Sequence, residues 1–303
     1  MARESVGAAR DVRLLVSLGV VYVVWGSTYL AIRVMVRSIP PLFGAGARFI
    51  LAGFILGLWI LVRRGVAAFG VSREQMANAV AIGLLILFGG IGLVTVAEQF
   101  VPSALTALLI ASIPLWVVLL RLGHGEQVAR RTIISVVLGF AGLALLLLPE
   151  ERAEAADWGP TLLVVVAAGS TAIGSFYSNR WDVPSNTLVA TVIEMLAAGI
   201  ALIVAAAVTG ELGDASVIDV SSSSLIAFAY LVTFGSLLAY NAFVWLLDNA
   251  PVSLVSTYAY VNPVIALILG VLLLNEDVSA LMSLGAVAIV VSVVAVVRTE
   301  GST

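Results

Sequence analysis

The chain has 303 residues, of which 61% are hydrophobic and 11% are charged, and its formal net charge is −3. A soluble domain cannot hide that much apolar surface, because only its interior is dry, whereas a membrane protein also exposes apolar side chains to lipid. The composition therefore predicts a polytopic membrane protein that lies in the lipid bilayer. The small net charge does not indicate a nucleic-acid partner.

The chain contains no cysteine and only one histidine, His124. Disulfides and thiolate metal sites are therefore excluded within it, and the usual metal sites and His-based catalytic sites lack the residues that they need. We expect no metal and no cofactor.

Ten apolar runs approach the length of about 20 residues that a membrane-spanning helix needs. They cover residues 14–35, 42–62, 77–97, 102–121, 132–149, 160–178, 187–209, 224–247, 252–274 and 279–297. The first run is too long for the apolar region of a signal peptide and lacks a clean cleavage site, so we expect it to be the first span. The sequence predicts an all-α protein with ten transmembrane helices and antiparallel neighbours.

The arginines, which are the basic residues besides His124, are distributed unevenly between the two sides of such a bundle. The side that holds both termini would carry Arg3, Arg10, Arg13, Arg63, Arg64, Arg73, Arg121, Arg130, Arg131, Arg180 and Arg298. The opposite side would carry only Arg33, Arg37 and Arg152. Because arginine-rich connectors remain in the cytoplasm, both termini are predicted to be cytoplasmic.

Two segments, PSALTALLIASIP at 102–114 and PVSLVSTYAYVNP at 251–263, share one pattern with their prolines and a leucine at a constant offset. The stretch 48–53 aligns in the same way with 194–199. Five spans per half is an odd number, so the second half would enter the membrane from the opposite face. We therefore expect two inverted five-helix repeats, 1–150 and 151–303, around a central cavity. Chance similarity between apolar segments is the alternative.

Pro114 and Pro263 lie at matching places within the fourth and ninth spans. Each proline removes one backbone hydrogen bond and frees the carbonyl four residues earlier. We interpret both as hinge or cavity elements, and a kink that serves only packing is the alternative.

Aromatic and hydroxyl side chains fall on shared helical faces in several spans. In the first span Tyr22, Trp25, Tyr29 and Arg33 share one face, which predicts a substrate path if it points inward and an interfacial aromatic belt if it does not. The candidate substrate-contacting residues are Tyr22, Trp25, Ser27, Tyr29, Arg48, Ser170, Tyr177, Tyr240, Asn241, Ser256, Tyr258, Tyr260 and Asn262. Such a surface suits a small amphipathic solute, although small residues also allow close helix packing without any ligand.

Two charged residues, Arg48 and Glu194, lie within the second and seventh spans at matching places. Charges inside a membrane are costly and are functional candidates by default. Arg48 could hold a substrate carboxylate, and Glu194 could be a protonatable coupling site. The alternative is a structural role, either as a fixed Arg48–Glu194 pair or with the arginine bonded to freed carbonyls.

Taken together, WGSTYLAIRV in the first span, ARFILAG in the second, PSALTALLIASIPLWVVLL in the fourth and AYVNPVIALILGVLLLNE in the ninth resemble the EamA-type transporters of the drug/metabolite transporter superfamily. The resemblance covers nearly the whole chain. It implies a secondary carrier of the bacterial inner membrane, commonly an exporter of amino acids, related metabolites or drugs. The family pattern carries over to Trp25, Gly26, Ser27, Arg48, Pro114, Pro263 and Glu276, whereas the sixth-span echo Gly169-Ser170-Thr171 lacks the tryptophan.

From the residues and the resemblance together, we expect a carrier that exports a small amphipathic metabolite, such as an amino acid, as a monomer or weak homo-oligomer. Proton coupling through Glu194 and facilitated diffusion remain alternatives. A channel would need a pore ring, usually formed by oligomerisation. A membrane-embedded enzyme would need clustered nucleophiles or metal ligands within the spans, which the sequence does not offer.

Overall fold

The computed structural model of the protein describes residues 2–146, 158–178, 180–213, 220–250, 258–274 and 279–300. Within these ranges the chain forms helices and no strand. The helices are α1 (Ala2–Met35), α2 (Pro41–Arg64), η1 (Val66–Phe69), α3 (Arg73–Gly83), η2 (Leu84–Gly92), α4 (Leu93–Ala97), α5 (Ser103–Ile110), α6 (Ile113–Gly123), α7 (Arg130–Leu146), α8 (Trp158–Ser178), α9 (Thr187–Val208), α10 (Ser222–Tyr230), η4 (Leu231–Tyr240), α11 (Asn241–Asn249), α13 (Tyr258–Leu274) and α14 (Ala280–Glu300).

Seven helical stretches in the described residues are long and apolar enough to cross a membrane. They are Val12–Met35, Pro41–Arg64, Arg73–Ala97, Ser103–Gly123, Trp158–Ser178, Thr187–Val208 and Ser222–Leu246. The helices α7, α13 and α14 occupy the places of the predicted fifth, ninth and tenth spans. The expectation of an all-α membrane protein is confirmed, while the predicted repeat boundary at 150/151 lies outside the described residues.

Helix ends follow local sequence signals. Pro41 occupies the first turn of α2, where a missing N–H costs nothing, and α2 ends at Gly65, whose φ of 71° suits glycine. Ser72 and Gln75 form a capping box at the start of α3.

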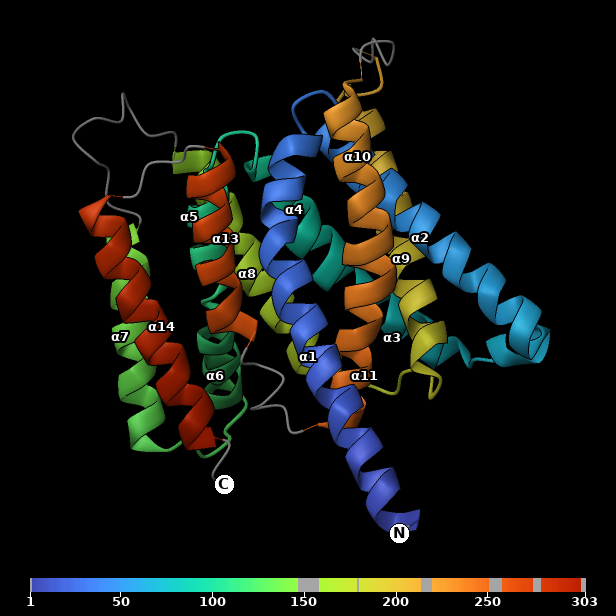
Figure 1. The fold of residues 1–303 in the computed structure, drawn as a ribbon, viewed down its shortest axis with the longest axis horizontal. Helices are drawn as coiled ribbons and strands as arrows, with labels where there is room; N and C mark the ends of the chain where they lie inside the picture. The colour runs from blue at the N-terminus through green and yellow to red at the C-terminus, as the bar shows by residue number, and fades with distance from the viewer. Residues whose placement is uncertain are drawn as a thin grey trace.

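The helices pack in a two-fold pattern across the two halves of the chain (Figure 1). Three pairs join a span to its counterpart in the other half: α2 with α9, α7 with α14, and α5 with α13. The first and sixth spans, α1 and α8, make equivalent contacts with the opposite half. The first span packs on η4 of the eighth span and on α13 of the ninth, whereas the sixth span packs on η2 of the third span and on α6 of the fourth. Each span thus contacts helices of the opposite half that correspond to those contacted by its counterpart, which agrees with two inverted five-helix repeats. The start of α1 and the end of α14 lie on the same side, which we call the terminal rim.

Close approach of α2 and α9 depends on glycine. A Cβ on Gly46 would lie 3.0 Å from the carbonyl oxygen of Gly199, and a Cβ on Gly199 would lie 3.0 Å from the carbonyl oxygen of Gly46. Small residues let helix backbones approach closely in lipid, where packing drives association. The two halves therefore meet backbone to backbone along this pair.

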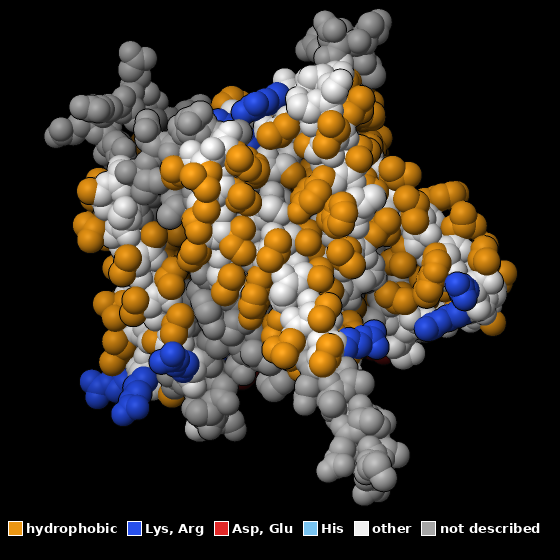
Figure 2. Space-filling model, in the orientation of Figure 1, with side chains coloured by type: hydrophobic (Ala, Val, Ile, Leu, Met, Phe, Trp, Pro, Cys, Tyr) orange, Lys and Arg blue, Asp and Glu red, His pale blue; other side chains and the backbone are white. Residues whose placement is uncertain are grey.

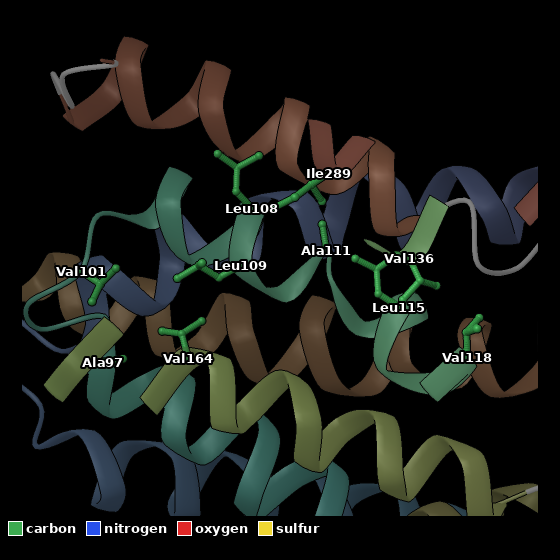
Figure 3. Packing of buried hydrophobic residues seen from close by; sticks show 10 residues of the cluster. All are labelled: Ala97, Val101, Leu108, Leu109, Ala111, Leu115, Val118, Val136, Val164 and Ile289. Atoms are coloured by element: carbon green, nitrogen blue, oxygen red, sulfur yellow. The ribbon is translucent and has the colours of Figure 1, made fainter. Parts of the chain in front are cut away.

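Away from the α2–α9 pair, buried apolar side chains of other helices also link the two halves. One cluster draws on spans three to six and on span ten, as Figure 3 shows, and its members are Ala97, Val101, Leu108, Leu109, Ala111, Leu115, Val118, Val136, Val164 and Ile289. Because residues from both repeats fill it, the repeats share this core.

The outside of the bundle is apolar, as a lipid-facing surface requires. Hydrophobic side chains cover the middle of the face shown in Figure 2, and arginines lie mostly toward its lower edge with one group at the upper edge. Exposed side chains such as Phe54, Val137 and Ile226 lie on α2, α7 and α10.

The two matching prolines have different surroundings. The fourth span is interrupted at Ala111 and Ser112, and Pro114 occupies the first turn of α6 after this break. Pro263 instead lies inside the continuous helix α13. Most of the second copy of the pattern, 251–257, lies outside the described residues. The predicted break is therefore observed at one proline, and the hinge roles remain predictions.

Candidate functional site

The third and eighth spans each contain a π-helical segment, η2 and η4, at equivalent places in the two repeats. Such wide turns are rare and occur frequently at functional sites. Each is flanked by α-helix on both sides, so it widens one stretch of an otherwise regular span. Two buried charged side chains, Arg48 and Glu194, are hydrogen-bonded to η4.

Arg48 on α2 points into the bundle and is only 4% exposed. Its Nε donates to the Ser236 hydroxyl on η4 at 2.8 Å, and no described residue accepts from its terminal amino groups. Gly235 makes room for the guanidinium, because a Cβ at that position would lie 2.8 Å from a terminal nitrogen of Arg48. The arginine therefore keeps donors available for an anionic group.

Glu194 on α9 is 8% exposed, and one of its carboxylate oxygens accepts a hydrogen bond of 2.7 Å from the hydroxyl of Tyr240. Within the described residues no ion pair joins it to Arg48. The predicted alternative of a fixed Arg48–Glu194 pair is therefore wrong. Each charge binds its own residue of η4, at positions four apart, and the two charges remain separate.

Trp25 on α1 lies in an aromatic cluster from three spans. Its ring centroid is 4.8 Å from that of Phe243, 5.2 Å from Tyr258 and 6.4 Å from Tyr240. Its indole N–H donates to the carbonyl of Gly235 at 3.4 Å, close to the arginine. Trp25, Tyr240 and Tyr258 are therefore brought together, and this part of the first-span face points inward.

The two Gly-Ser-Thr motifs take equivalent places against the π-helical spans. The Ser27 hydroxyl lies 2.6 Å from that of Tyr230 on α10, and the Ser170 hydroxyl donates to the Leu85 carbonyl on η2 at 2.7 Å. Ser27 also donates to the carbonyl of Val24 on its own helix. Both hydroxyls thus bridge neighbouring spans. The Gly-Ser-Thr motifs of the first and sixth spans, although only weakly similar in their surrounding sequence, occupy equivalent places in the structure.

The remaining candidates of the first span line its packed faces. Tyr22 packs beside Trp25 against Leu18, Val21 and Leu246, whereas Tyr29 packs against a separate cluster that contains Ile32. Tyr22 therefore adjoins the aromatic cluster around Trp25. Tyr29 lies one helical turn further along α1 and packs in a different apolar cluster.

Two amides place unpartnered acceptors in the interior. The Oδ1 atoms of Asn241 and Asn262 are buried without a hydrogen-bond partner, and Asn262 is 3% exposed. The amide nitrogen of Asn241 donates to the Leu237 carbonyl at 2.6 Å. Buried polar atoms without partners are uncommon and need an explanation. A solute that carries N–H or O–H groups would supply the missing donors.

Tyr177 does not join this cluster. It lies at the end of α8, where its hydroxyl is 3.1 Å from Nε2 of His124 and its ring stacks on Trp181. The expectation that it contacts solute beside the other candidates is therefore corrected, since helical spacing fixes a face but not a depth. Ser256 lies outside the described residues, and Tyr260 lies within α13.

Sequence reasoning missed Gly235 and Phe243. Gly235 contributes a carbonyl and an open space, neither of which has a side-chain signature. Gly89 and Gly235 are separated by the same number of residues as Arg48 and Glu194, and this was the available signal. In the described part of the chain, no group of three or more His, Cys, Asp or Glu side chains could hold a metal ion.

Comparison with known proteins identifies the family to which the chain is similar. The model of the EamA-like transporter family matches residues 14–148 and 158–298. The uncharacterized inner membrane transporter YedA of Escherichia coli K12 is 38% identical over 281 residues, which cover 92% of this chain and 89% of that protein. A probable amino-acid metabolite efflux pump of the same organism is 24% identical, with 89% of each chain covered.

A solved crystal structure of a protein has the same fold, with a TM-score of 0.65 and 21% identity over 95% of this chain and 96% of that one. The two family matches fall on the two halves whose helices pack as inverted counterparts. The chain therefore belongs to the EamA-like transporter family and is a membrane transporter.

Proposed function

We propose that this transporter exports a small amphipathic solute that carries a carboxylate and an amino group, such as an amino acid, by alternating access. The halves, 1–150 and 151–303, would rock about a site between them, with both termini in the cytoplasm of a bacterial cell. The arginine bias toward the terminal rim supports this orientation. The name of the E. coli efflux pump supports the direction and the class of solute.

The observation that carries the proposal is the arrangement of two opposite charges, Arg48 on α2 and Glu194 on α9, that are both hydrogen-bonded to side chains of η4. Arg48 has terminal N–H groups to which no described residue binds, and Glu194 has one oxygen engaged by Tyr240. A carboxylate fits the first and an ammonium group fits the second, because buried charges need opposite charges or hydrogen bonds. The aromatic cluster around Trp25 would cover the apolar part of the solute.

The test is an uptake screen in proteoliposomes that compares matched solutes. L-Phenylalanine carries a carboxylate and an ammonium group, and phenethylamine lacks only the carboxylate. The proposal predicts saturable uptake of amino acids and little uptake of the amine. Equal uptake of both compounds would contradict the assigned role of Arg48.

A drug efflux carrier of the same fold is the second candidate, favoured by the aromatic cluster of Trp25, Phe243 and Tyr258. Such a cluster attracts flat cations through the faces of its rings. Transport of ethidium without transport of any amino acid in the same screen would favour this candidate.

A further inference from the structure

We propose that α6 is a gate at the terminal rim, with a hinge at Ala111–Ser112 and a latch formed by Glu126 and His124 on Arg180 and Tyr177. The inference rests on the alternating access of the proposed function. It adds a specific moving part and the contacts that hold it closed.

The hinge is the break in the fourth span. Ser112 follows the end of α5, and its hydroxyl donates to the Leu109 carbonyl at 2.6 Å and accepts from the Trp116 indole at 3.2 Å. The backbone N–H of Ser112 also donates to the Leu109 carbonyl at 3.1 Å, three residues back and not four, so the regular α-helical ladder is interrupted where α5 and α6 meet. A break of this kind, followed by proline, concentrates bending at a few residues.

The latch lies just beyond the other end of α6. One oxygen of Glu126 accepts from Arg121 Nε at 2.7 Å, and the other accepts from Arg180. Arg121 belongs to the same half as Glu126, whereas Arg180 follows α8 in the second half. Among the described residues both ion pairs use Glu126, and the pair with Arg180 joins the halves.

Neighbouring contacts strengthen the same junction. His124 is hydrogen-bonded to Tyr177 at 3.1 Å, and the Arg180 guanidinium lies 3.6 Å from the centroid of the Phe176 ring. Nearby, Gln75 and Asn78 of α3 donate to Asp182 at 3.2 and 2.9 Å. First-half residues therefore hold the end of the sixth span from two sides.

Opening of this rim would require the latch to separate. A solute between the halves must reach the terminal rim in one state and the opposite rim in the other. Here α6 packs on α8 and the latch is formed, so the structure has this junction closed. Movement of α6 about Ala111–Ser112 would separate Glu126 from Arg180 and leave Arg121 with Glu126.

The chain contains no cysteine, so spin labels can be attached at chosen sites. Exposed Gln127 and Ser185 lie on the two sides of the latch and can both be replaced by cysteine. Their distance distribution would be measured by double electron–electron resonance in liposomes without solute. The proposal predicts that Glu126→Gln, and separately Arg180→Gln, shift it toward a longer-distance population.

Arg130→Gln is the matched control, because it removes an exposed arginine at the start of α7, four residues after Glu126, that forms no ion pair with another described residue. It should retain the distribution of the parent protein. An unchanged distribution in Glu126→Gln and Arg180→Gln would overturn the latch, and an equal shift in Arg130→Gln would do the same. Because no solute is present, either result leaves the proposed solute class standing.

Discussion

Arg48 and Glu194 show how one π-helical segment can separate two buried charges. They occupy equivalent places in α2 and α9, yet Arg48 binds Ser236 and Glu194 binds Tyr240. An isolated charge in a membrane is expensive, and each charge here has at least one hydrogen bond. The arrangement leaves binding capacity at each charge, which a close ion pair would consume.

Removal of the arginine charge should weaken solute binding. Hydrogen bonds to charged groups contribute about 1.5–3 kcal/mol, so Arg48→Gln should raise the apparent KM for the carboxylate solute roughly tenfold to a hundredfold. The measurement is saturable uptake in proteoliposomes. Arg13→Gln is the control, since Arg13 lies on the ring of Trp245 at 4.4 Å and outside the site. An unchanged KM in Arg48→Gln would make Arg48 a structural residue.

Glu194 is the candidate for proton coupling. In Glu194→Gln the side chain keeps its size but cannot exchange a proton, so any dependence of transport on an imposed proton gradient should disappear. Tyr240→Phe is the companion variant, because it removes the 2.7 Å hydrogen bond and keeps the carboxylate. It should retain the gradient dependence. Full gradient-driven transport in Glu194→Gln would show that Glu194 does not couple.

At the scale of the elements, glycines fix where the π-helical spans pack. A Cβ on Gly83, directly before η2, would lie 2.6 Å from the backbone of Glu194, whereas a Cβ on Gly169 of α8 would meet nothing within 4 Å. Backbone cannot move aside as a flexible side chain can. The approach of α3 to α9 therefore depends on Gly83 and positions the carboxylate of Glu194.

Gly83→Ala should therefore destabilise the fold. Overpacking of a closely packed site costs about 1–3 kcal/mol, which should lower the melting temperature measured in detergent. Gly169→Ala is the matched control in an open position, where alanine favours a helix by roughly 0.5–1 kcal/mol. A Gly83→Ala protein as stable as the control would contradict this packing.

The connector after α6 should respond to pH in a defined direction. Hydrogen bonds from Arg121 and Arg180 hold the pKa of Glu126 below its ordinary value of 4.5. A lowered pKa in the folded state means that the bonds are fully present above 4.5 and are lost as the pH falls through the lowered value. The distance between labels at residues 127 and 185 should thus stay constant from pH 8 to pH 5. A change within this range would show that the ionisation of Glu126 does not control the distance.

Some of these elements could be predicted from the sequence, and others could not. Hydropathy identified the spans, and the offset between Pro114 and Pro263 indicated the repeat, because both depend on local patterns. The π-helical turns depend on packing against other spans and have no local signature. The partner of Arg48, Ser236, lies 188 residues away. Tyr177 shares a face with Ser170 but lies at the rim, because depth depends on how α8 is placed.

For the molecule as a whole, the equivalent helix contacts made by the two halves link the repeat to its function. The pairs α2–α9, α7–α14 and α5–α13 join each span to its own counterpart, so the halves can be related by a two-fold axis in the membrane plane. A transporter built in this way can reach its two states by exchanging the roles of its halves. The polar site at η4 breaks the symmetry, because at the offset that relates Gly89 to Gly235 the third span has Gly90 in the place of Ser236 and Val94 in the place of Tyr240.

The central claim is that this protein carries solute by alternating access through a site between its halves. Counterflow in proteoliposomes tests it most directly, with labelled phenylalanine outside and unlabelled phenylalanine inside. A carrier must return its site to the other face, so internal phenylalanine should accelerate uptake of the label, and Arg48→Gln should lose most of this acceleration. An uptake rate that does not depend on internal solute would contradict the account and indicate a channel.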